Sequence, residues 1–137
     1  MIKITLNDFL KLPKEQYSSK LLCFITDTVF GLGVVDDEFI EVGLNKIYSL
    51  KQRDSNKPIS LLVPSIDSVI DKIIFPIEFK YLSSYWPGAL TVIFKKKSND
   101  YFSWTKRDTI GIRIPNSEVA LKVLNHLGPI ATTSVNI

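Results

Sequence analysis

Thr109-Ile110-Gly111-Ile112-Arg113-Ile114 is the stretch of sequence that decides the fold. Its polar and apolar residues alternate, which predicts an extended strand with the three isoleucines on one face and Thr109, Gly111 and Arg113 on the other. The isoleucine face predicts contact with a hydrophobic core. On the opposite face an arginine among apolar neighbours needs a partner, and Gly111 removes bulk where something must come close. The strand therefore indicates both a core and a candidate site.

Strands and helices alternate on both sides of this stretch, which predicts an α/β fold. The run 21–25 is apolar at every position and is typical of a strand buried on both faces. Because helical crossovers and a hairpin around residues 95–100 both occur, we expect a mixed sheet. The other predicted strands are 60–63, 89–94 and 130–134, and the predicted helices begin near Asn7, which can cap the first of them, and near Asp36 or Asp37, Pro64, Phe79 and Asn116 or Ser117. Helical spacing predicts three apolar stripes on these helices: Ile40, Leu44, Ile47 and Tyr48; Ile66, Val69, Ile70 and Ile73; and Ala120, Val123, Leu124 and Leu127.

The composition limits the chemistry. The 137 residues are 45% hydrophobic, and 17 Lys and Arg against 14 Asp and Glu give a net charge of +3, which permits an anionic ligand without indicating a nucleic-acid-coating protein. The single cysteine, Cys23, excludes a disulfide framework and is interpreted as a core residue, and the single His126 excludes a histidine-rich metal site.

No linker or repeat divides residues 1–137, so we expect one domain. No membrane-length apolar run or signal peptide is evident, so we expect a cytoplasmic protein.

Three cations, Lys51, Arg53 and Lys57, lie within seven positions at the predicted end of a helix and in the loop after it. They can converge on an anion only if the backbone has left helical geometry there, because helix neighbours two positions apart do not share a face. The alternative is a solvated basic helix terminus that complements the helix dipole. A second basic tract, residues 95–97, is interpreted as a solvated hairpin end.

Arg113 is the second candidate. A ligand carboxylate or phosphate would suit it, because a guanidinium binds such groups through two parallel hydrogen bonds. The alternative is an internal ion pair with a carboxylate such as Asp27 or Asp36, and the sequence leaves both open.

Small polar side chains follow two of the predicted strands, at Thr132 to Asn136 and at Thr26-Asp27-Thr28. Ligands of open α/β sheets bind beyond the carboxyl ends of strands, where such side chains hold phosphates or a ribose. Turn and capping roles are the alternative. Gly31 and Gly33, which follow the second cluster, are a weak sign of a phosphate loop because the full glycine fingerprint is absent.

Taken together, these segments resemble the YrdC-type threonylcarbamoyl-AMP synthase family from about Leu22 to the last residue. The motifs occur in the family's order, and the resemblance rests on the set rather than on any one of them. They are Thr26-Asp27-Thr28-Val29-Phe30-Gly31-Leu32, Lys51-Gln52-Arg53, Trp86-Pro87-Gly88-Ala89-Leu90-Thr91, Ile112-Arg113-Ile114-Pro115 and Ser134-Val135-Asn136.

The resemblance implies a single-domain, twisted mixed sheet with flanking helices and a concave basic cavity. Relative to the family the sequence looks shortened at its C-terminal end, because members usually continue beyond the Ser-x-Asn motif. The implied activity is that of an L-threonylcarbamoyladenylate synthase, a nucleotidyltransferase that joins L-threonine, bicarbonate and ATP into threonylcarbamoyl-AMP and pyrophosphate. Downstream transfer proteins use that product for the threonylcarbamoyladenosine modification of tRNA.

The resemblance also implies roles for individual residues. The implied catalytic group, which holds the phosphates, is Lys51, Arg53, Ser134 and Asn136. The implied ATP contacts are the same four residues with Lys57 and Thr109. The implied threonine contacts are Thr28, Arg113 and Thr132. Mg²⁺ is expected to arrive with ATP and to be held mainly by phosphates and water, with no protein metal ligand.

Two other functions stay open at this stage. One is a non-catalytic module of the same fold that binds tRNA or double-stranded RNA through its basic cavity. The other is an inactive truncated fragment whose last strand is an exposed sheet edge.

Overall fold

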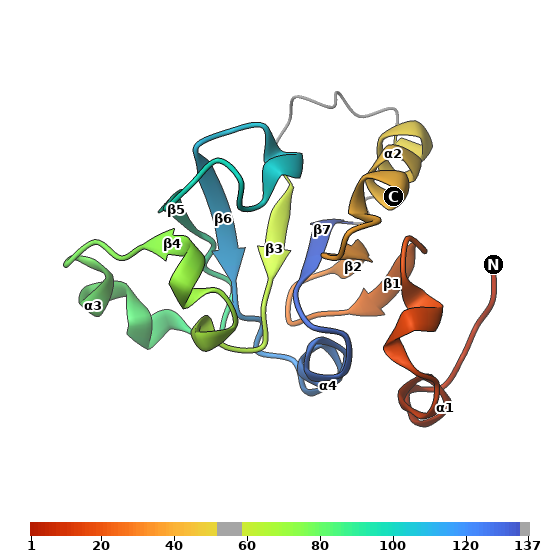
Figure 1. Cartoon of the computed structure of the whole chain (residues 1–137). Coiled ribbons are helices and arrows are strands. Elements are labelled where there is room, and N and C mark those ends of the chain that lie inside the picture. The colour runs from red at the N-terminus through yellow and green to blue at the C-terminus, as the bar shows by residue number, and fades with distance from the viewer. Residues whose placement is uncertain (52–58, 135–137) are drawn as a thin grey trace.

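The computed structural model describes residues 1–51 and 59–134, apart from the side chain of Lys51. These residues form a seven-stranded sheet with the order β1-β2-β7-β3-β6-β5-β4 (Figure 1). β3 and β6 pair in parallel and the other neighbours pair antiparallel, so the predicted mixed sheet is confirmed. The strands are β1 Leu22–Ile25, β2 Phe30–Val35, β3 Ser60–Leu62, β4 Ile73–Ile74, β5 Val92–Lys96, β6 Thr109–Arg113 and β7 Ile130–Ser134.

In the described residues, four α-helices and five short 3₁₀ helices precede or connect the strands. They are α1 Leu6–Lys11, η1 Lys14–Tyr17, α2 Ile40–Lys51, η2 Ile66–Ser68, η3 Ile70–Lys72, α3 Phe79–Leu82, η4 Ser83–Tyr85, η5 Ser103–Thr105 and α4 Glu118–Leu127. The predicted cap of α4 is confirmed at Ser117, whose hydroxyl accepts a hydrogen bond from the Ala120 N–H at 3.2 Å. The predicted cap of α1 at Asn7 is wrong, because Thr5 accepts from the Asp8 N–H instead.

One face of the sheet, here called the α2 face, carries the larger core. Ile110 and Ile112 of β6 are buried in it, as their alternation predicts. From α2 it receives the predicted stripe: Ile40, Leu44 and Ile47 are buried, and Tyr48 is partly buried against the same core. The helix lies close to β2: a Cβ on Gly43 would lie 2.4 Å from Val34 Cγ1, so only glycine fits there without movement.

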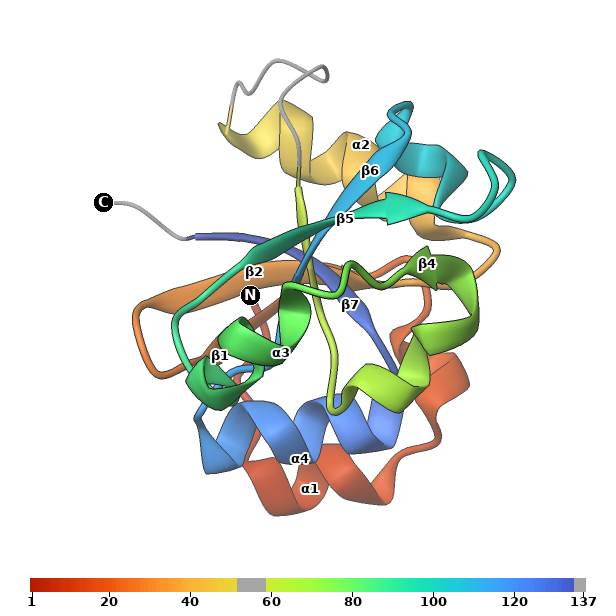
Figure 2. The ribbon, with the colours of Figure 1, turned by 90° about the vertical axis from the view of Figure 1, so that its left-hand side faces the viewer.

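The opposite face, here called the α4 face, is covered over only part of its area. α4 and α1 pack on one end of it (Figure 2). They form a second core around Leu62 and Ile130. The buried α4 residues are those predicted from helical spacing, Ala120, Val123, Leu124 and Leu127. The positive φ of 84° at Gly128 ends the helix, since glycine tolerates this conformation.

Two strands occupy different places from those predicted. β1 is an edge strand, and one of its faces is open to solvent, so the prediction of burial on both faces is wrong. On that face Ile25 is 47% exposed, and Cys23 is an exposed free thiol rather than a core residue. β7 lies between β2 and β3, so the predicted exposed edge at the last strand is also wrong. Apolar composition indicates a strand but does not show how many neighbours the strand will have.

The helix predicted after Pro64 is wrong as well. Residues 66–72 form the two 3₁₀ turns η2 and η3, and Ile73 then pairs with Lys96 in the sheet. The isoleucines have helical spacing, but strand pairing at the sheet edge determines the structure that forms here. Gly31 and Gly33 are also not in a loop, because both lie inside β2 and pair with β7.

The basic tract at residues 95–97 is not wholly solvated. β5 extends through Lys96, which is 6% exposed and donates hydrogen bonds from Nζ to the Phe102 carbonyl and the Thr105 hydroxyl, both at 3.3 Å. Burial lowers the pKa of Lys96 below its usual value of 10.5, although the nearby Asp108 carboxylate acts in the opposite direction. Lys96 is therefore a structural residue of the β5–β6 connection.

Candidate functional site

A strip of glycine and hydroxyl residues crosses the α4 face beyond the part that α4 covers. Thr132 of β7 stands opposite Gly33 of β2 on one side and Ser60 of β3 on the other. Gly111 of β6 continues the strip, because a Cβ added there would lie 3.6 Å from Ser60 Oγ. Thr132 is buried, and its hydroxyl donates to the Ser60 carbonyl at 3.5 Å. These small residues leave the sheet open to close approach by a ligand.

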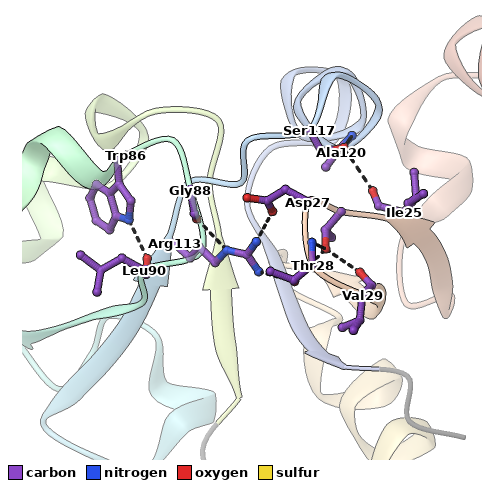
Figure 3. Close-up of polar contacts among 11 residues, drawn as sticks. Ile25, Asp27, Thr28, Val29, Trp86, Gly88, Leu90, Arg113, Ser117 and Ala120 are labelled. Atoms are coloured by element: carbon purple, nitrogen blue, oxygen red, sulfur yellow. Dashed lines mark hydrogen bonds and ion pairs between the residues drawn. The ribbon is translucent and has the colours of Figure 1, made fainter.

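Arg113, at the end of β6, lies on this same face. Its Nε donates to the Gly88 carbonyl at 2.9 Å and its Nη1 to the Thr28 hydroxyl at 3.3 Å (Figure 3). Its Nη2 forms an ion pair with the Asp27 carboxylate, and the two side chains are only 12% and 16% exposed. The internal ion pair considered from the sequence is therefore present. The predicted threonine contacts Thr28 and Arg113 are also brought together.

The twist of the sheet makes this contact possible. β3 and β7 separate β6 from β2, so three strand spacings, about 14 Å, lie between them. Figure 2 shows β6 and β2 running in clearly different directions, which carries the turn between β1 and β2 back toward the end of β6. Within that turn the Thr26 hydroxyl accepts from the Thr28 N–H at 3.2 Å and donates to the Val29 carbonyl. The turn is thus held by its own hydrogen bonds.

The tryptophan motif fixes the other side of Arg113. Trp86 Nε1 donates to the Leu90 carbonyl at 2.7 Å, and the Gly88 N–H donates to the Ile114 carbonyl at 2.8 Å. A Cβ on Gly88 would lie 2.5 Å from the Tyr85 carbonyl oxygen, so the close turn requires glycine. The sequence reasoning did not find Gly88 as a partner of Arg113, because a backbone carbonyl carries no side-chain signal.

The remaining predicted site residues divide into two groups. Thr109 and Ser134 are half-buried at the ends of β6 and β7, and Ser134 stands opposite Gly31. Alternation along the strands places both on the α4 face, with Arg113 and Thr132. The other predicted residues, the Lys51 side chain, Arg53, Lys57 and Asn136, lie outside the described residues. The phosphate-binding group therefore stays a prediction.

Comparison with known proteins agrees with these motifs. The family model Sua5_yciO_yrdC, described as "Telomere recombination", matches residues 17–137. The chain belongs to this family. A relative from Methanocaldococcus jannaschii is 33% identical over 132 residues, which cover 95% of this chain and 60% of the relative. The threonylcarbamoyl-AMP synthase of Pyrococcus abyssi is 34% identical over 123 residues, covering 86% of this chain and 35% of the enzyme.

A solved structure of the same family supports the fold. The crystal structure of Pyrococcus abyssi Sua5 complexed with L-threonine is similar with a TM-score of 0.77 and 28% identity. The likeness covers 99% of this chain and 41% of that protein. The chain spans between 35% and 65% of the length of the curated Sua5/YrdC relatives it matches. Among the helices of the described residues, none is long and apolar enough to cross a membrane.

A separate cavity of about 500 Å³ lies between the start of α2 and η5. It is lined by carboxylates of residues 36–41 and by Phe102 and Trp104. Asp36 accepts a hydrogen bond from Trp104 Nε1 at 3.1 Å. Burial raises the pKa of Asp36 above its usual value of 3.8, although the Trp104 hydrogen bond and the Lys72 charge oppose the shift.

Asp36→Asn is expected to stabilise the protein at neutral pH but not in acid. Because its folded pKa is raised, the folded state binds more protons than the unfolded state above pH 3.8, so Asp36 lowers stability as pH rises through that folded pKa. An asparagine oxygen still accepts from Trp104 without this cost. Thermal unfolding should show a higher Tm for the variant at pH 7 and no gain at pH 3. Asp71→Asn, at an exposed carboxylate, is the matched control; a gain that does not change with pH would contradict the assignment.

Proposed function

We propose that this chain acts as a threonylcarbamoyl-AMP synthase, joining L-threonine, bicarbonate and ATP with release of pyrophosphate. The observation that carries the proposal is the meeting of Arg113 and Thr28, which are 85 residues apart in sequence, at 3.3 Å on an open sheet face. A guanidinium beside a hydroxyl suits the carboxylate of an amino acid. The Pyrococcus abyssi relatives, one named for this activity and one solved with L-threonine, support the choice.

In the proposed reaction Arg113 binds the threonine carboxylate and Thr28 orients it. Gly88 holds the guanidinium in place through its carbonyl, so the arginine is preorganised before the substrate arrives. Thr132, in the adjacent strip, supplies a further hydroxyl contact. Fixing the carboxylate in this way directs the threonine amine toward bicarbonate and the resulting carbamate toward the α-phosphorus of ATP.

In this proposal ATP binds on the strip of small residues. The residues implied to bind its phosphates are Lys51, Arg53, Ser134 and Asn136, with Lys57 and Thr109 as further ATP contacts. The positive charges of the lysine and arginine side chains would stabilise the negative charge that develops as pyrophosphate departs. Within residues 1–51 and 59–134 no group of three or more His, Cys, Asp or Glu side chains could hold a metal. As the resemblance implies, the proposal gives Mg²⁺ no protein ligand and leaves it with the phosphates and water.

The product determines the partners in this proposal. Threonylcarbamoyl-AMP is an activated acyl donor, so its use requires a second protein that transfers the threonylcarbamoyl group to tRNA. We place both steps in the cytoplasm.

The decisive experiment incubates the whole chain with ATP, L-threonine, bicarbonate and Mg²⁺. Threonine-dependent pyrophosphate release is expected, together with a threonylcarbamoyl-AMP peak on chromatography. The Pyrococcus abyssi synthase is the positive control, and omission of threonine is the blank. If the control releases pyrophosphate and this chain does not, the proposal fails. Steeply salt-dependent tRNA binding without saturable ATP binding would then support the RNA-binding alternative.

A further inference from the structure

The pairing of Arg113 with Asp27 is unexpected for a site that binds a carboxylate. Asp27 places a negative charge against the guanidinium that is proposed to attract the substrate's negative charge. Arg113 has five N–H groups, and three of them have partners among the described residues: the Gly88 carbonyl, the Thr28 hydroxyl and Asp27. Within the part of the chain that the structure describes, the other two N–H groups have no partner. Two N–H groups are enough to bind a carboxylate, so binding one does not require that Asp27 be displaced.

Asp27 is not the sole contact that holds the elements it joins. The turn that carries it is fixed by the hydrogen bonds of Thr26 to the Thr28 N–H and the Val29 carbonyl. The guanidinium is fixed from the other side by the Gly88 carbonyl at 2.9 Å. Asp27 Oδ2 accepts no hydrogen bond from any part of the chain that the structure describes. One oxygen of a largely covered carboxylate is thus available at the site.

The charges determine which ligand suits this arrangement. The Arg113–Asp27 pair has a net charge near zero, so a simple carboxylate is attracted by the guanidinium and repelled by Asp27 at almost the same place. A zwitterion carries both charges, so its carboxylate can bind the Arg113 guanidinium and its ammonium group can bind the Asp27 carboxylate. Repulsion of the wrong ligand is as much a part of specificity as attraction of the right one.

We propose that Asp27 is a specificity-determining residue, whose carboxylate binds the ammonium group of an amino acid while Arg113 binds its carboxylate. This inference rests on the proposed function, since it concerns the same threonine site. It assigns to Asp27 the selection of an α-amino acid over a hydroxy acid of the same shape. Asp27 acts in binding, and no proton transfer is assigned to it.

The test compares L-threonine with (R)-3-hydroxybutyrate, which has the same carbon chain, hydroxyl and carboxylate but no amine. Binding of each to the whole chain is measured by calorimetry, with and without a non-hydrolysable ATP analogue. The wild-type protein is expected to bind threonine at least about 10-fold more tightly, the worth of one charge-assisted hydrogen bond. Equal affinity for the two ligands would overturn the inference, and this comparison requires no variant.

The variant Asp27→Asn separates selection from structure. It is expected to weaken threonine binding about 10-fold or more while leaving (R)-3-hydroxybutyrate unchanged or bound more tightly, so that the preference is lost. Asp36→Asn, an acid-to-amide change in the separate cavity, is the matched control and should keep the preference. Asp27→Glu should restore part of it.

Two negative outcomes have different meanings. An Asp27→Asn variant that loses both ligands equally, or neither, overturns the role of Asp27 while the proposed function stands. A wild-type protein that binds neither ligand overturns both proposals.

Discussion

Replacing Arg113 by alanine is expected to raise the KM for threonine in the proposed reaction by about 10- to 150-fold and to lower kcat/KM accordingly. A hydrogen bond to a charged group contributes about 1.5–3 kcal/mol, and each 1.4 kcal/mol corresponds to a factor of ten. The loss falls on threonine because the structure places the guanidinium beside Thr28. Steady-state kinetics of pyrophosphate release, with threonine and ATP varied in turn, measures the effect.

Two control variants define what this result means. Lys122→Ala removes one positive charge from an exposed ion pair with Glu118 on α4 and should leave both KM values unchanged. Arg113→Lys keeps the charge but loses the planar fork, so it should recover only part of the activity. An unchanged threonine KM in Arg113→Ala would remove Arg113 from the substrate site.

The fold was most predictable where one periodicity dominated. The alternation in β6, the stripe of α2 and the capped helix α4 were all predicted from the sequence and are confirmed. The errors fall where pairing partners decide the structure. Cys23 lies in an apolar run, yet β1 is an edge strand and the thiol is exposed. Ile73 has helical spacing with its neighbours, yet it pairs with Lys96 in the sheet.

The sequence singled out Arg113 and offered Asp27 as a partner, but it did not predict the contacts that the two residues make. Arg113 was singled out because a strand placed it among apolar neighbours, and Asp27 was one of two carboxylates considered for it. Asp27 is the partner because the twist of the sheet brings the β1–β2 turn to Arg113 across two intervening strands. Asp36 is instead bonded to Trp104 in a separate cavity. The local sequence does not indicate which distant carboxylate will pair with Arg113, and it does not indicate that the Gly88 carbonyl will accept a hydrogen bond from it.

The same alternation that places Arg113 on one face of β6 buries Ile112 on the other. Ile112 is fully buried, at 0% exposure, in the core of the α2 face. Ile112→Ala is expected to lower the free energy of unfolding by about 2–5 kcal/mol, since it removes buried carbon atoms and leaves a cavity. Urea unfolding measures this loss. If the alanine variant does not fold, Ile112→Val should give a smaller loss of about 0.5–1.5 kcal/mol.

Ile93 on the adjacent strand β5 is the matched control for this prediction. It stands opposite Gly111, one position from the pair formed by Val92 and Ile112, and it is 71% exposed. Ile93→Ala should therefore cost less than about 1 kcal/mol, the span of strand propensity alone. Equal losses at Ile93 and Ile112 would mean that the open half of the α4 face is covered in solution. Unequal losses in the predicted order mean that the part of this face around Ile93 and Gly111 is uncovered in solution.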